Sequence, residues 1–437
     1  MILSSFILAF AMTQAVEAPP TDHPWSLKEC TEWALEHNLT VTAQSLSVEG
    51  SKIEKNTADM AWLPSVNGSA SESWSFGRGI GGDNTYENGN SSSTSLNLNA
   101  GMNLFDGLAT PRRMQLARLN LEAATQDLEK ARNDIRVQVA QAYVQTLYNY
   151  EIADVAREQL SIDSLQVARL EGLFSTGRAS AAEVSQQKAS LAQSQVTLVQ
   201  AENNVRSSLL ALAQLLELPD WEAFSILRPK VQMEEVTVGL PDIVFIDALA
   251  MRPEVRAEQL RLEGAAKQVQ IAKAAYSPSL SLSAGLGSNY YSNFGTSGFW
   301  DQLRSNFSQY VGLSLNIPIF NRFATRNQVR SAKLHQANQA LQLRRTEQNL
   351  YKDIQTAWNG AIAARTKWEA SQVAADAARD AFTLTQAKYE GGKATFTEFN
   401  ESRARMAKAQ SDSVQATYEY LFQTRLVEFY RGGSLDL

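Results

Sequence analysis

The stretch LNLNAGMNLFDG, from Leu96 to Gly107, alternates apolar and polar residues with a period of two. Every second position carries an apolar side chain, at Leu96, Leu98, Ala100, Met102 and Leu104. This alternation predicts a β-strand with one apolar face. Residues 112–171 then contain neither glycine nor proline, which predicts one very long helix directly after the strand.

Three other stretches alternate in the same way, so four strands are expected: Val66 to Phe76, Thr94 to Leu104, Leu280 to Tyr290 and Tyr310 to Ile319. Each has about ten residues, the length with which a tilted strand crosses a bilayer. A soluble sandwich gives the same alternation in an isolated pair of strands. Aromatic residues near the strand ends favour a membrane barrel, because such residues gather at membrane interfaces.

Two loops join the strands in pairs. The first is GRGIGGDNTYENGNSSS, rich in glycine, serine and asparagine, and we expect it to be a flexible external loop rather than a phosphate loop, because no helix opens after it. The second carries aromatic residues at Tyr291, Phe294, Phe299 and Trp300. We expect these aromatics to occlude part of the barrel mouth.

The N-terminus MILSSFILAFAMTQAVEAPP has the pattern of a secretory signal. Its apolar run is too short to span a bilayer as a helix. We expect a signal peptide at residues 1–15, with cleavage after Ala15, or alternatively after Ala18. No apolar run of membrane-helix length follows, so the mature chain is expected to be periplasmic or inserted in a membrane as strands.

Charge and motifs exclude several classes of function. The net charge is −6 and no basic stripe is visible, which argues against a nucleic-acid partner. Cys30 is the only cysteine, so neither a disulfide within the chain nor a thiolate metal site is expected. No nucleophile elbow, P-loop or dinucleotide fingerprint occurs. We therefore expect no enzyme activity, no cofactor and no metal.

The chain repeats itself at an offset of 214 or 215 residues. AWLPSV matches AYSPSL, NLFDG matches PIFNR, LFSTGRAS matches KYEGGKAT, and ALEHN matches ALAMR. We expect a first repeat at 25–218, a linker at 219–240 and a second repeat at 241–431. Each repeat is predicted to contain a helix, a pair of strands and a long helical hairpin.

The hairpins are predicted from apolar residues spaced by three and four. Long helices are expected from Thr110 to Leu173 and from Arg322 to Tyr389, and returning helices from Ala179 to Leu216 and from Ala394 to Tyr430. Four strands cannot close a membrane barrel, since about eight is the smallest bacterial case. Copies of the chain must therefore associate, and three copies would supply twelve strands, with the long helices forming a helical tube.

The paired WLPSV and YSPSL, the strand-ending NLFDG, WSLKECTEWALEHN near the start and KYEGGKATFTEFNESRA near the end resemble the TolC family of outer-membrane efflux and secretion channels. The resemblance covers about Trp25 to Arg431. It implies a mixed α and β membrane protein: a homotrimer with a twelve-stranded barrel in the outer-membrane lipid and an α-helical coiled-coil barrel in the periplasm of a Gram-negative bacterium. A periplasmic adaptor would connect it to an inner-membrane transporter.

The same resemblance gives a candidate site at the periplasmic aperture. Glu398 and Glu401 lie three residues apart, on one helix face. They match the family's acidic aperture ring, which in a trimer would favour cations and raise the carboxylate pKa by mutual repulsion. The alternative is that they are ordinary solvated helix residues.

A second group matches the network that closes the aperture. Glu183 matches an aspartate that holds the entrance closed, with Tyr389 as its expected hydrogen-bond partner. Ala394 stands where the best-known members have a locking arginine. Lys393 precedes it, and Arg178 is the residue that matches Lys393 in the first repeat.

We thus expect the outer-membrane exit channel of a tripartite efflux pump that passes small molecules or drugs. One alternative is the exit duct of a type I protein secretion system. Another, from a different class, is a periplasmic adaptor or structural protein, against which the duplicated hairpin and the lipid-facing strands argue.

Overall fold

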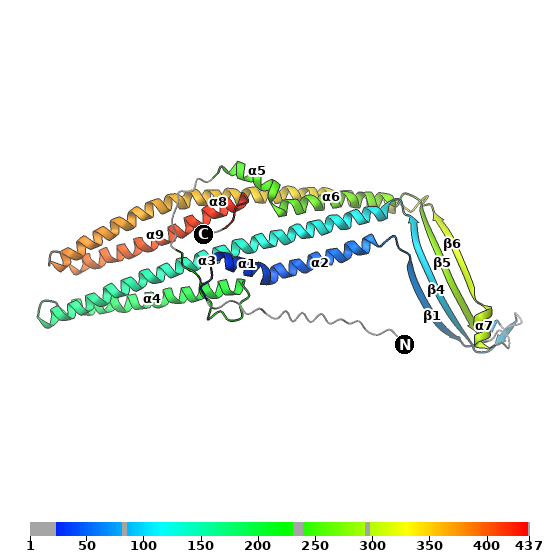
Figure 1. Ribbon diagram of the computed structural model, residues 1–437, viewed down its shortest axis with the longest axis horizontal. Helices are drawn as coiled ribbons and strands as arrows, with labels where there is room; N and C mark the ends of the chain where they lie inside the picture. Colours follow the sequence, from blue (N-terminus) through cyan, green and yellow to red (C-terminus); the bar gives the residue numbers. More distant parts are fainter. Residues whose placement is uncertain (1–22, 81–84, 230–238, 293–297, 436–437) are drawn as a thin grey trace. The chain divides into compact units, whose positions relative to one another are not determined.

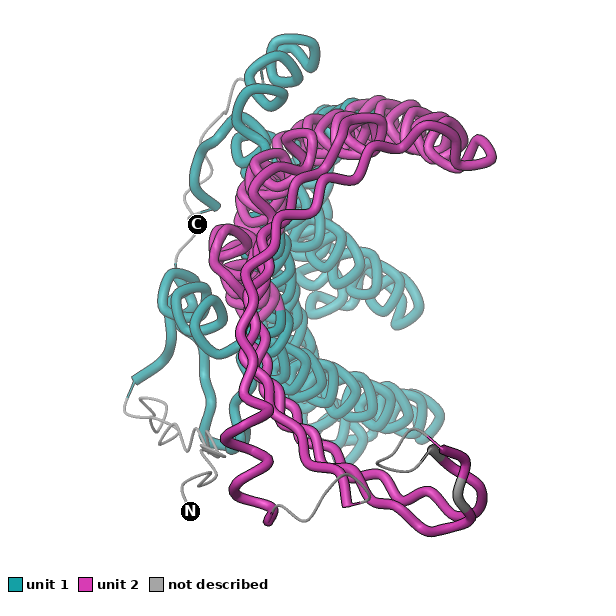
Figure 2. The backbone as a smooth tube through the Cα atoms, turned by 90° about the vertical axis from the view of Figure 1, so that its right-hand side faces the viewer, with its two compact units in different colours: residues 1–43, 129–252, 349–437 teal, residues 44–128, 253–348 magenta. Residues whose placement is uncertain are grey.

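The computed structural model describes residues 23–80, 85–229, 239–292 and 298–435. The expected signal peptide, residues 230–238 of the expected linker, and Phe294 lie outside these residues. The chain forms two compact units, coloured separately in Figure 2. Unit 1 comprises residues 1–43, 129–252 and 349–437, and unit 2 comprises residues 44–128 and 253–348. Among the described residues, no helix combines the length and the hydropathy needed to cross a membrane.

Helices supply most of the described chain (Figure 1). In the first half they are α1 (Leu27–His37), α2 (Leu39–Asp59), α3 (Ala109–Ser175) and α4 (Ala181–Leu215). In the second half they are α5 (Pro241–Met251), α6 (Pro253–Ala274), α7 (Phe299–Ser305), α8 (Ala324–Glu390) and α9 (Phe396–Tyr430).

The long helical hairpins confirm the duplication. Helices α3 and α8 both have 67 residues, and α4 and α9 both have 35. Their bounds differ from the predicted ones by two residues or fewer. Gly360 does not interrupt α8, because tertiary contacts outweigh the cost of about 1 kcal/mol for one glycine in a helix.

The matching segments ALEHN and ALAMR each form the end of a helix, with the same backbone hydrogen bond. Helix α1 ends at His37, and the backbone N–H of Asn38 donates to the carbonyl of Ala34. Helix α5 ends at Met251, and the N–H of Arg252 donates to the carbonyl of Ala248 in the same way. The expected single helix at the start of each repeat is therefore two helices, with an extended residue between them.

Unit 2 contains a four-stranded antiparallel sheet with the order β1-β4-β5-β6. Its strands are β1 (Ser65–Ser75), β4 (Ser91–Phe105), β5 (Ser279–Tyr291) and β6 (Ser308–Asn316). In the register, Gly68, Leu98 and Leu286 lie side by side, as do Leu282 and Leu313 on the last two strands. The even-numbered positions of β4 and β5 thus share an apolar face, as the alternation predicts.

The opposite face of the sheet is polar. Asn97 and Asn99 of β4 lie beside Gly287 and Gly285 of β5. The Tyr310 hydroxyl of β6 reaches across to Asn99 Oδ1 at 3.3 Å. A Cβ on Gly285 would lie only 2.4 Å from the Tyr310 ring, so the glycine makes room for this cross-strand contact.

The loops contain structure that the sequence analysis does not predict. Two short strands, β2 (Arg78–Ile80) and β3 (Tyr86–Asn88), pair within the expected flexible loop, so that expectation is wrong for these residues. Helix α7 occupies the aromatic loop. Strand β6 ends at Asn316 rather than at Ile319, because Pro318 has no N–H to continue the ladder.

In unit 1 the start of the chain is held by Trp25, of which only 3% is exposed. Its N–H donates to the carbonyl of Ser225, and its carbonyl accepts from the N–H of Leu227. Part of the expected linker therefore packs against the fold rather than crossing open solvent. Cys30 is buried nearby, and burial raises the pKa of its thiol to about 12, so the thiol is inert.

Candidate functional site

The candidate site lies at the ends of the two hairpins of unit 1, where α3 turns into α4 and α8 turns into α9. Gly177 and Gly392 have φ of +73° and +72°. The N–H of Arg178 donates to the carbonyl of Leu173 at 2.8 Å, and the N–H of Lys393 donates to that of Lys388 at 2.7 Å. Both are Schellman turns, which require the left-handed conformation that glycine adopts without strain.

Each returning helix then begins with a capping box. Ser180 Oγ accepts from the N–H of Glu183 at 3.2 Å, and Glu183 Oε2 accepts from the N–H of Ser180 at 2.8 Å. Thr395 and Glu398 repeat this arrangement at 3.2 Å and 2.7 Å. Glu183 and Glu398 are therefore equivalent residues, each held at the third position of a helix.

The cap sets the electrostatics of Glu398. The backbone and side-chain hydrogen bonds from Thr395 hold the pKa of this carboxyl below its ordinary value, and Lys388 adds to the shift. Within one chain this direction is opposite to the rise expected from repulsion between copies. Glu401 lies one turn further along α9 and forms an ion pair with Arg405 at 3.2 Å. The prediction that these carboxylates form a ring stays a prediction.

Tyr389, at the end of α8, is half-buried in an aromatic cluster. Its ring stacks on Phe399 with centroids 4.9 Å apart and lies beside Phe396. Burial raises the pKa of the Tyr389 hydroxyl, and the negative charge of Glu183 adds to the rise. Glu183 is thus close enough to influence Tyr389, while its carboxylate bonds to the Ser180 cap. A direct bond between the two remains a prediction.

The basic residues of the predicted closing network lie on the turns. Arg178 and Lys393 contribute their backbone N–H groups to the Schellman bonds, and among the described residues neither side chain forms an ion pair within 4.0 Å. The two hairpins are instead joined by Arg169 of α3, which pairs with Glu390 of α8 at 3.0 Å. Sequence reasoning misses this pair.

A buried polar network also escapes the sequence analysis. Asp163 of α3 is fully buried and forms an ion pair with Arg403 of α9. Gln187 Nε2 donates to Asp163 Oδ1 at 2.9 Å, and Ser194 Oγ donates to Oδ2. Burial lowers the pKa of Arg403. Three helices from both hairpins therefore meet at one carboxylate.

The sequence does contain a signal for this network, because charged residues occupy positions of the helices that are otherwise apolar. Phe396, Phe399 and Met406 mark the buried stripe of α9, and Arg403 falls on the same stripe. Asp163 interrupts the buried stripe of α3 between Ala156 and Leu170. A charged residue on the buried stripe of a helix predicts a partner of opposite charge on a neighbouring helix. The sequence alone does not identify that partner.

The described residues combine a sheet that has one apolar and one polar face with four long helices in two equivalent hairpins. The outer membrane efflux protein family model matches residues 31–217 and 245–428. The chain belongs to this family and is accordingly an outer-membrane protein.

Characterised relatives include the pyoverdine export outer membrane protein OpmQ of Pseudomonas aeruginosa, which is 28% identical over 284 residues that cover 63% of this chain and 56% of OpmQ. The fusaric acid resistance protein FusA of Burkholderia cepacia is 29% identical over 63% of this chain and 52% of its own length. This chain thus spans little more than half the length of these two relatives. The cation efflux system protein CusC of Escherichia coli O157:H7 is 26% identical over 84% of this chain and 76% of CusC.

Solved structures share the fold. The outer membrane protein VceC of Vibrio cholerae superposes with a TM-score of 0.78 at 23% identity, covering 94% of this chain and 97% of VceC. The CmeC outer membrane channel of Campylobacter jejuni has a TM-score of 0.79 at 19% identity, covering 94% and 87%.

Proposed function

We propose that the chain is the outer-membrane exit channel of a tripartite efflux pump and that it works as a homotrimer. The β-sheets of three copies would close a barrel in the lipid, and the helical hairpins would line a periplasmic tunnel. A periplasmic adaptor and an inner-membrane transporter would deliver the substrate and the energy. The chain itself would be a passive duct and not an enzyme.

The observation that carries this proposal is the sheet. It has one apolar and one polar face, and its edge strands β1 and β6 each present one row of backbone N–H and C=O groups that the other described strands of the sheet do not pair. In lipid each unpaired group costs several kcal/mol, so a sheet with open edges must close. Because the apolar face suits lipid and the polar face suits water, closure with copies of the chain gives a water-filled barrel.

The hairpin ends support a selective aperture. Glu398 and Glu401 lie on one face of α9, and threefold repetition would place six carboxylates around one axis. The Glu398 cap favours the ionised form, which would keep the ring negative at neutral pH. Small molecules are the proposed cargo, since the names of two relatives refer to pyoverdine export and to cation efflux.

Single-channel recording in planar bilayers tests this function. We expect wild-type trimers to give small, cation-selective openings that multivalent cations block from the periplasmic side. The variant Glu398→Ala with Glu401→Ala should lose both the selectivity and the block. A matched control is Glu419→Ala, which removes another carboxylate of α9, one paired with Lys367 at 2.6 Å.

The outcomes separate the parts of the proposal. A chain that neither forms trimers nor inserts in the bilayer contradicts the channel function. A channel whose selectivity survives in the double variant, or is lost equally in Glu419→Ala, contradicts the acidic ring alone.

A further inference from the structure

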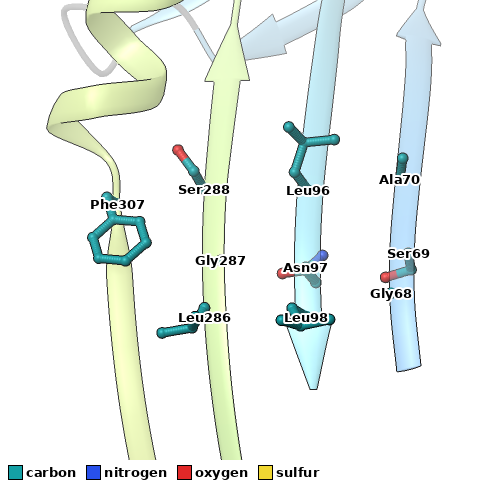
Figure 3. Close-up of a pocket in the computed structure, with 10 residues that line it drawn as sticks. All are labelled: Gly68, Ser69, Ala70, Leu96, Asn97, Leu98, Leu286, Gly287, Ser288 and Phe307. Carbon is teal, nitrogen blue, oxygen red and sulfur yellow. The ribbon is translucent and has the colours of Figure 1, made fainter. Parts of the chain in front are cut away.

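A groove runs along the apolar face of the sheet in unit 2 (Figure 3). Its volume is about 480 Å³, and its lining includes Gly68, Ala70, Leu96, Leu98, Leu286 and Phe307. The hollow arises because β1 carries only a hydrogen and a methyl group, at Gly68 and Ala70, where β4 carries two leucines. Leu96 pairs with Ala70, and Leu98 pairs with Gly68.

Helix α7 is fixed on the same face, at one end of the groove. Ser288 Oγ donates to the carbonyl of Leu303 at 2.6 Å, and the Tyr290 ring meets Phe299 at 5.1 Å. Ser288 and Tyr290 lie on the same face of β5 as Leu286, which is the apolar face of the sheet. Tyr290 and Phe299 thus belong to the apolar side of the sheet. The expectation that the aromatic loop occludes the barrel mouth stays a prediction.

Specific side-chain hydrogen bonds from α7 to the backbone of β5 fix the position of this helix. Gln302 is buried; its amide oxygen accepts from the N–H of Tyr291 at 3.1 Å, and its amide nitrogen donates to the Tyr291 carbonyl at 3.1 Å. Asn306 Nδ2 donates to the carbonyl of Asn289 at 2.7 Å. With this side of α7 fixed, Trp300 and Arg304 lie one turn apart on its exposed side.

We infer that the groove between β1 and Phe307 holds one acyl chain of an outer-membrane lipid, with Trp300 and Arg304 at the level of its headgroup. This inference rests on the proposed placement of the sheet in the membrane. Aromatic and basic side chains are the usual anchors at a membrane surface, and Phe307, 57% exposed, lines the groove from the β6 side, beside Ser288 (Figure 3).

The occupant follows from the state of the groove floor. Residues 98 and 286 belong to ladders that continue on both sides, so the backbone of the floor is already paired on β4 and β5. The unpaired row of β1 lies at the sheet edge, where the proposed function pairs it with another copy of the chain. A peptide lying there would bury its own backbone groups without partners, which is costly. An acyl chain has no polar groups to satisfy and is continuous with the lipid that would cover the rest of the apolar face.

A filling variant tests the inference. The full-length channel is reconstituted in phosphatidylcholine vesicles with a phospholipid that carries a nitroxide on its acyl chain, and the motionally restricted part of the spectrum is measured. Gly68→Leu with Ala70→Leu fills the groove and should lose a restricted component that the wild type shows. The control Ala284→Leu fills a neighbouring hollow on the same face, lined also by Ala100 and Val311, and should keep that component.

A second measurement separates this inference from the proposed function. In a Cys30→Ser background, a nitroxide attached at Val311→Cys should be relaxed by oxygen more than by a water-soluble nickel chelate, whereas one at Ser71→Cys should show the reverse. If the label at 311 is exposed to water, the sheet does not face lipid and the proposed function fails.

If label 311 faces lipid but the filled variant keeps its restricted lipid, only the groove inference is overturned. It is equally overturned if Ala284→Leu loses the same component, or if filling the groove changes the oligomeric state instead.

Discussion

The α3–α4 hairpin and the α8–α9 hairpin end in turns of the same backbone geometry, yet the side chains packed behind those turns differ. Gly177 corresponds to Gly392, and the Ser180 cap corresponds to the Thr395 cap. Behind the second turn lie Tyr389 and Phe399, which stack on each other. The equivalent positions in the first hairpin are Phe174, which is half exposed, and Val184.

The polar network is not duplicated either. Asp163 corresponds to Ala378, a small apolar residue in the other hairpin. Arg403 corresponds to Lys188, which forms an exposed ion pair with Glu171 at 2.7 Å. One hairpin thus supplies the buried carboxylate and the other supplies the buried guanidinium, so each needs the other.

This difference between the hairpins separates features that depend on residues within one repeat from features that depend on both repeats. The turn and its cap depend on a few adjacent residues, so both repeats keep them. The packing between the hairpins depends on partners far apart in the sequence, so the two repeats have diverged to complement each other. The buried pair therefore connects the hairpins, whereas the caps only start the helices.

The largest effect is expected from breaking the buried pair. Arg403→Met leaves Asp163 buried without its counter-charge and should lower the free energy of unfolding by about 3 to 5 kcal/mol. Lys188→Met, the equivalent change in the first hairpin, removes an exposed pair and should cost less than about 1 kcal/mol. Guanidinium unfolding in detergent, followed by circular dichroism, measures both.

The double variant Asp163→Leu with Arg403→Met should recover most of that loss, because it removes both charges from the buried site. Equal losses in Arg403→Met and Lys188→Met would show that the network is no more important than a surface pair.

A smaller and symmetric effect is expected at the turns. Gly177→Ala and Gly392→Ala each place a side chain at positive φ, at a cost of about 1 to 2 kcal/mol. Neither added Cβ meets an atom within 4 Å, so strain is the only cause and the two costs should match. Gly172→Ala, inside α3, should stabilise the helix instead. Thermal unfolding compares the three variants, and unequal costs at the two turns would contradict their equivalence.

The caps should contribute less again. Ser180→Ala and Thr395→Ala each remove one N-cap and should cost about 1 kcal/mol each. Ser185→Ala, an exposed position inside α4, is the control and should have little effect. The same unfolding measurements apply, and a cap loss no larger than that of Ser185→Ala would show that the capping boxes do not stabilise the hairpins.

The smallest expected effect is on the pH at which the Glu398 carboxylate loses its charge. Because the Thr395 cap lowers the pKa of Glu398, its ionised form, and any stability from the cap, should be complete above the ordinary pKa and lost as the pH falls through the lowered value. Cation selectivity should therefore persist to lower pH in the wild type than in Thr395→Ala, where the pKa rises. Conductance recorded as a function of pH measures this shift.

Ser180→Ala alters the equivalent cap without touching Glu398 and should leave the titration unchanged. A wild-type midpoint above about 4.3, the ordinary glutamate value, would mean that repulsion between copies outweighs the cap.

Much of the fold can be predicted from local sequence. The period of two in Leu96 to Leu104 predicts strand β4 and its faces, and the residues without glycine or proline predict α3. Helix α7 cannot be predicted in this way, because it is only 7 residues long and depends on Gln302 and Asn306 bonding to β5. The candidate glutamates are found by resemblance and spacing. The capping role of Glu183 and Glu398 could also be predicted, because Ser180 and Thr395 stand three residues before them.

The sequence by itself determines the elements whose causes lie within a few residues: the alternating strands, the long helices, the glycine turns and the caps. Only the tertiary structure decides which charges on the buried helix stripes meet, and that α7 lies on the apolar side of the sheet. The physical reason is range along the chain, since the hydrogen bonds within a helix, the helix caps and the strain of a turn act between near neighbours in the sequence. The Asp163 and Arg403 pair and the groove on the apolar face of the sheet exist only where distant segments are brought together.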